Sequence, residues 1–101
     1  MQAAKFLDSL IVMRSFRDDI WVELKWNPVI EQMWQGFKLS KNECNKITNY
    51  MEKQRKGMIE WGFQQDRMYA LDKYWDLYGW DALSYAKSVD EVFDRIKQLL
   101  S

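Results

Sequence analysis

Residues 3–26 read AAKFLDSLIVMRSFRDDIWVELKW, and this first long apolar segment decides the predicted fold. On a helical wheel, which turns about 100° per residue, its apolar side chains form one continuous stripe. The stripe consists of Ala3, Phe6, Leu10, Met13, Phe16, Ile20, Trp21 and Leu24. The run from Leu10 to Met13 would suit a buried strand, but no alternation of apolar and polar residues flanks it. The segment therefore predicts one long helix from Ala3 to Trp26 with one face in a core.

A second apolar arc lies on another side of the same predicted helix. Its members are Leu7, Ile11, Val22 and Trp26. Two interpretations remain open: the helix is central and has neighbours on two sides, or the arc contacts another chain. The second interpretation makes these four residues candidates for partner binding or for a homodimer interface.

Two boundary signals divide the next part of the chain. Asn27 can cap a helix and Pro28 suits the first helical position, so a short second helix follows and ends near Gly36. Ser40 and Glu43 have the spacing of a capping box, in which each side chain satisfies a backbone donor of the other residue. A third helix is therefore predicted to start at Ser40, with a buried face of Cys44, Ile47, Met51 and Met58.

The remaining helices are predicted from glycines and from a second capping box. Gly57 and Gly62 predict a break or kink, because glycine costs about 1 kcal/mol inside a helix. A fourth helix is predicted over 64–78, and a last one from Val89 to Leu100, capped by Ser88 and Glu91. The predicted buried face of this last helix is Val89, Val92, Phe93, Ile96, Leu99 and Leu100. The predicted fold is thus all-α, a compact bundle of four to five helices that forms one domain over residues 1–101.

Composition excludes several classes of protein. Hydrophobic residues make up 48% of the chain, which is enough for a packed core and argues against disorder. Charges interrupt every apolar segment, so no membrane span is predicted. Cys44 is the only cysteine and no secretory signal is visible, which together favour a reducing, cytoplasmic location. The net charge is zero, which argues against indiscriminate nucleic-acid binding.

The sequence lacks the residues that most enzymes use. It contains no histidine, which removes the commonest general base and metal ligand and excludes Ser-His-Asp and Cys-His arrangements. No glycine-rich phosphate loop or metal-binding cysteine pair is present. Asp72 and Asp76 share a helical face, but such carboxylates are far more often surface charge. We therefore predict no enzymatic activity, no cofactor and no metal.

The face of the third helix opposite its buried face is polar and basic. It carries Lys41, Asn42, Asn45, Lys46, Asn49, Lys53 and Lys56. Asparagine can read adenine edges and lysine neutralises phosphate, although a solvated helix surface looks the same. The helices around Gly36 have the gross form of a helix-turn-helix, but Gln32 replaces a small residue and Asn42 and Asn45 replace apolar ones. A DNA-binding regulator that uses Asn42, Asn45, Lys46, Asn49, Lys53 and Lys56 is the alternative function.

The aromatic content favours a protein partner. Six tryptophans, five phenylalanines and five tyrosines are more than a core of this size holds easily. Tryptophan and tyrosine carry much of the binding energy at protein interfaces. The predicted function is a non-enzymatic interaction module, such as an adaptor, an inhibitor or an accessory protein of a virus or mobile element. The predicted contact residues are Leu7, Ile11, Val22, Trp26, Tyr69, Tyr74 and Trp80.

Overall fold

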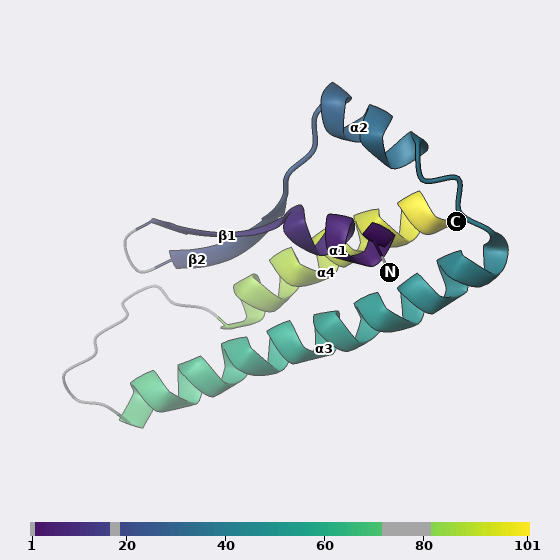
Figure 1. The fold of residues 1–101 in the computed structure, drawn as a ribbon. Coiled ribbons are helices and arrows are strands. Elements are labelled where there is room, and N and C mark those ends of the chain that lie inside the picture. Colours follow the sequence, from purple (N-terminus) through teal and green to yellow (C-terminus); the bar gives the residue numbers. More distant parts are fainter. Residues whose placement is uncertain (1, 17–18, 72–81) are drawn as a thin grey trace.

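The computed structural model describes residues 2–16, 19–71 and 82–101, with side chains described for 2–16, 19–65 and 82–101. Figure 1 shows the order of the elements. They are α1 (Gln2–Ser9), β1 (Ile11–Phe16), β2 (Asp19–Leu24), α2 (Pro28–Gln35), α3 (Lys41–Leu71) and α4 (Ala82–Leu100). The long helices α3 and α4 run in opposite directions beside each other, and α1 and the hairpin pack on them (Figure 1). No helix in these ranges is both long enough and apolar enough to cross a membrane.

The predictions of a helix from Ala3 to Trp26 and of an all-α bundle are wrong. The segment forms the short helix α1 and then an antiparallel hairpin, in which Met13 lies opposite Val22 and Phe16 opposite Asp19. β-Branched side chains are frequent in both strands, and they favour an extended backbone. On β2 the alternation that marks a strand is present, because Ile20, Val22 and Leu24 share one face. The helical wheel placed Leu24 and Ile20 together as well, so the periodicity alone did not distinguish the two structures.

The core lies between α1, β2, α3 and α4. Leu7, Ile47, Val89 and Ile96 have no exposed surface, and Tyr85 is almost completely buried. The predicted buried faces are confirmed for α3 at Ile47 and Met51, and for the last helix at Val89, Val92, Phe93, Ile96 and Leu100. Cys44, Met58 and Leu99 are half-buried against the same core.

The predicted break between Gly57 and Gly62 is wrong, because α3 is continuous through both glycines. Gly62 is needed for packing and not for a turn. A Cβ atom at Gly62 would lie 2.4 Å from Cδ1 of Tyr85, so only glycine lets the Tyr85 ring pack this close to α3. The predicted separate helix from about Gln64 is likewise wrong as far as Leu71, which still belongs to α3. Residues 72–78 of that prediction lie outside the described residues.

The predicted start of the last helix at Ser88 is also wrong. The helix begins at Ala82, and Ser88 lies within it. The Ser88 hydroxyl donates to the carbonyl of Tyr85 (2.7 Å) and accepts from the backbone N–H of Val22 (3.1 Å). The side chain that was expected to cap a helix therefore joins α4 to β2.

The two other helix starts are confirmed. The Asn27 side chain accepts from the N–H of Ile30 (2.9 Å), with Pro28 in the first turn of α2. At α3 the N–H of Glu43 donates to the Ser40 hydroxyl (3.2 Å), and the N–H of Ser40 donates to the Glu43 carboxylate (3.3 Å). Both motifs act within a few residues, and for that reason they can be recognised without knowledge of the tertiary structure.

Candidate functional site

Of the residues predicted for partner binding, the four whose side chains are described do not form one exposed surface. Leu7 lies on α1 and Val22 on β2, and both are buried in the core. Ile11 and Trp26 are half-buried and pack against that core. A homodimer through these four residues would require the protomer to open. The other three candidates, Tyr69, Tyr74 and Trp80, lie outside the part of the chain whose side chains are described.

An aromatic cluster attaches α2 to the body of the molecule. The Phe6 ring on α1 stacks on Trp34 of α2, with ring centroids 6.4 Å apart, and Phe37 lies 5.2 Å from Phe6 and 5.8 Å from Trp34. These rings hold α2 beside the start of α3 and the end of α4. Trp34 remains half-buried, because one side of its indole borders an open groove.

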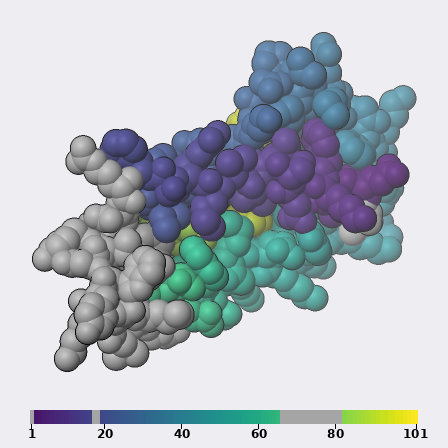
Figure 2. Space-filling view, turned by 60° about the vertical axis from the view of Figure 1, so that its left-hand side comes forward, coloured from purple at the N-terminus to yellow at the C-terminus, as the bar shows by residue number. Residues whose placement is uncertain are grey.

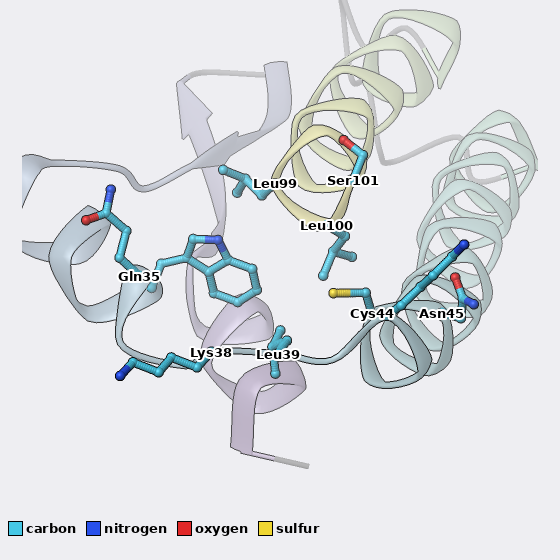
Figure 3. A pocket seen from close by; sticks show the side chains of 10 residues that line it. Gln35, Lys38, Leu39, Cys44, Asn45, Leu99, Leu100 and Ser101 are labelled. Carbon is cyan, nitrogen blue, oxygen red and sulfur yellow. The ribbon is translucent and has the colours of Figure 1, made fainter.

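This groove, which we call the α2–α3–α4 groove, has a cavity volume of about 570 Å³. Its apolar lining comes from three parts of the chain and consists of Trp34, Leu39, Cys44, Leu99 and Leu100. Its polar lining is Gln35, Lys38, Lys41, Asn45 and Ser101. Figure 3 shows Leu39, Cys44 and Leu100 approaching one another from different elements. A concave apolar surface with a few polar groups at its edge is the usual form of a ligand site.

The charge at the edge of the groove is positive. Lys38 and Lys41 are exposed, and neither side chain forms an ion pair or hydrogen bond with another described residue. Among the described residues, no aspartate or glutamate side chain lines the groove. Lys38 has a positive φ of 38°, a conformation that costs a non-glycine residue about 1 kcal/mol and that shapes the turn between α2 and α3.

The carboxylates between α3 and α4 are arranged differently. Glu52 pairs with Lys97 (3.1 Å) and Arg55 (3.0 Å), and Arg55 also pairs with Asp90 (2.8 Å). The hydrogen bond from Lys97, followed by that from Arg55, lowers the pKa of Glu52. The hydrogen bond to Asp90 is the largest cause that raises the pKa of Arg55. These charges link α3 to α4, whereas the side chains of Lys38 and Lys41 pair with no described carboxylate.

The residues of the alternative nucleic-acid site lie together on α3. All six of them, Asn42, Asn45, Lys46, Asn49, Lys53 and Lys56, are exposed, as is Lys41. None of the four lysines on this face pairs with a carboxylate among the described residues. Asn45 also lines the α2–α3–α4 groove, so the two candidate surfaces meet at that residue.

Sequence reasoning did not identify most of the groove. Trp34 was placed on the second helix by its spacing, Leu39 next to Cys44 at the start of the third helix, and Leu99 on the buried face of the last helix. The available signal was the number of apolar residues on α2, because a helix of eight residues cannot bury all of them. Among these residues Trp34 lines the groove, whereas Val29 and Met33 lie outside it and are 66% and 54% exposed. That signal shows that a surface exists but not which distant residues complete it.

In the part of the chain with described side chains, no group of three or more Cys, Asp or Glu residues is placed to hold a metal ion. Asp72 and Asp76 lie outside the described residues. The groove contains one thiol, that of Cys44, with no carboxylate side chain beside it. No protein-family model, no curated protein and no solved structure matches the chain.

Proposed function

We propose that this protein is a non-enzymatic interaction module that binds an apolar segment of a partner protein in the α2–α3–α4 groove. The observation that supports this proposal is an apolar groove of about 570 Å³ whose edge carries two lysines without ion pairs. An adaptor, inhibitor or accessory protein needs such a surface and no catalytic group. We assign the module to the cytoplasm, because Cys44, its only cysteine, has no second cysteine in the chain with which to form a disulfide.

The side chains that line the groove indicate which kind of segment it would bind. Its lining would take one or two large apolar side chains, which lose water when they contact Trp34, Leu39 and Leu100. Lys38 and Lys41 favour acidic residues next to these anchors, since opposite charges speed association and exclude basic segments. The proposed ligand is therefore a short segment with an apolar anchor and flanking aspartate or glutamate.

The test is selection of peptides from a random display library, followed by measurement of binding to charge-reversed variants. We expect the selected peptides to combine apolar and acidic residues. The double substitution Lys38→Glu and Lys41→Glu should weaken binding by about tenfold or more, since two attractive pairs become repulsive. The matched control, Lys53→Glu with Lys56→Glu, changes the same charge away from the groove and should change affinity by less than about twofold.

Cys44 provides a second test that does not change charge. Alkylation of its thiol with a bulky maleimide should fill the groove and abolish binding of the selected peptides. The Cys44→Ser variant, treated with the same reagent, is the control and should bind as before. Equal binding by the alkylated and untreated proteins would contradict the assignment of the groove.

The second candidate function is nucleic-acid binding by the exposed face of α3. It is favoured by four lysines, Lys41, Lys46, Lys53 and Lys56, that pair with no carboxylate among the described residues. If it is correct, duplex affinity falls steeply with salt, and Lys46→Ala or Lys53→Ala each lowers the slope of log affinity against log salt by about one. A duplex titration at low salt that shows no binding would remove this candidate.

A further inference from the structure

We propose that the free edge of β1 binds an extended segment of a partner protein as an antiparallel third strand. This surface shares no residue with the α2–α3–α4 groove, so the inference is independent of the function proposed above. It depends on three observations about the described residues: the direction of backbone groups on β1, the absence of edge protection, and a hollow beside the strand whose described lining is uncharged.

The hairpin register determines which backbone groups face outward. The N–H of Lys25 donates to the carbonyl of Leu10 (2.7 Å), which marks this pair as a hydrogen-bonded position of the hairpin. In an antiparallel pair the bonded residues alternate, which turns the N–H and C=O groups of Ile11, Met13 and Ser15 away from β2. Those three residues form no hydrogen bond on that edge with any described residue. The same alternation turns the N–H of Val22 outward on β2, where Ser88 satisfies it (3.1 Å).

The two edges of the hairpin are therefore unlike. β2 lies against α4, and its central residue Val22 is 4% exposed. On β1, Met13 is 49% exposed, and Arg14 and Ser15 are exposed too. Proteins usually protect an open edge with lysine, proline or a bulge. β1 contains no lysine or proline, and its pairing with β2 has no bulge. Its one charged residue, Arg14, is paired with Glu23 at 3.3 Å.

A hollow of about 270 Å³ lies beside β1 and defines the chemistry of the incoming strand. The described residues that line it carry no charge and are Met13, Gln54, Gly57, Met58, Trp61 and Tyr85. A Cβ atom at Gly57 would meet nothing within 4 Å, so space remains above α3. Figure 2 shows the purple and indigo strands lying over the green part of α3. A third strand would place every second side chain toward this hollow, and those side chains must be apolar and uncharged.

The probe is a synthetic peptide of alternating valine and threonine with a lysine at each end. In the antiparallel arrangement, valines over the hollow lie opposite Ile11, Met13 and Ser15 and direct their N–H groups at β1. We expect N-methylation of the valines to weaken binding by about tenfold or more, and N-methylation of the threonines by less than about twofold. The unmodified peptide should also slow amide hydrogen exchange at Ile11, Met13 and Ser15. The proposal is overturned if valine methylation has no effect, or if the unmodified peptide does not bind at millimolar concentration.

A pair of protein variants tests the same edge. Met13→Pro removes the central outward N–H, which an edge strand tolerates, and Met13→Ala retains it while removing the same side chain. Binding should be lost in the first variant and retained in the second, while circular dichroism confirms that both fold. If sedimentation shows that the unliganded protein is a dimer that Met13→Pro dissociates, a second copy occupies the edge, and the proposed partner segment is wrong. The methylated peptides are tested on the unchanged protein, so they test the proposed strand pairing even if Met13→Pro does not fold.

Discussion

The N-terminal segment and α4 carry the same kind of apolar stripe, yet they fold differently. In α4 the stripe through Val89, Phe93, Ile96 and Leu100 is buried along one continuous helix. In the N-terminal segment the same spacing runs from Phe6 to Leu24 and is divided between a helix and two strands. α4 packs along part of the longer helix α3, whereas the hairpin covers α4 through β2. A stripe therefore shows that a segment has an apolar face, and the neighbouring surface decides which backbone presents it.

The largest expected effect concerns how closely α3 and α4 approach each other. Gly62→Ala should destabilise the protein by about 3 kcal/mol, because the new methyl group would overlap the Tyr85 ring. Gly57→Ala is the matched control on the same helix, and it should stabilise by about 1 kcal/mol because no atom lies near the new group. Urea unfolding of the two variants measures both changes. Equal effects at the two glycines would show that the packing of Tyr85 does not require Gly62.

The next effect concerns the contact between the hairpin and α4. Ser88→Ala should cost about 1 to 2 kcal/mol, because the partly buried N–H of Val22 loses its acceptor. Amide hydrogen exchange at Val22 should become faster, while exchange in the middle of α3 should change little. Ser84→Ala is the control, since Ser84 is exposed on the same helix, and its effect should stay within about 0.5 kcal/mol.

Loss of the helix cap at Ser40, which involves only neighbouring residues, should have a smaller effect on stability. Ser40→Ala removes the hydroxyl that accepts from the N–H of Glu43, and it should cost about 1 kcal/mol. Ser40→Asp retains an acceptor at the cap and should restore most of the loss. Thermal unfolding of the pair distinguishes capping from a change in side-chain volume. Loss of stability in both variants to the same extent would contradict the capping role.

The smallest expected effect is the pH dependence from Glu52. Its pKa is lowered in the folded protein from a usual value near 4.5, chiefly by Lys97 and then by Arg55. The unfolded chain therefore takes up the proton first as the pH falls, so the stabilisation is present above pH 4.5 and is lost as the pH decreases through the folded pKa. Glu52 is partly solvated, so the loss should be below about 1 kcal/mol. Glu52→Gln should flatten this part of the stability–pH curve, and an unchanged curve would contradict the pairing.

The two proposed surfaces differ in how readily they can be predicted from the sequence. β1 belongs to one local hairpin, and the second strand of this hairpin could have been recognised from the alternating apolar residues Ile20, Val22 and Leu24. The α2–α3–α4 groove joins Trp34 to Leu99 and Leu100, which lie more than half the chain away. No local pattern connects such residues. The exposed face of α3, by contrast, was predicted residue by residue, because seven polar side chains on one side of a helix favour contact with water over burial.

The amino-acid sequence alone determined the features that depend on neighbours within one helical turn. These features are the caps at Asn27 and Ser40, the buried stripe of α4 and the polar face of α3. Only the tertiary structure decided that residues 11–24 form a hairpin, that Gly62 is a contact and not a break, and that Ser88 bonds to a strand. The reason is physical: hydrogen bonds within one turn form wherever the chain is helical, whereas the conformation of an apolar segment depends on the shape of the surface that removes it from water.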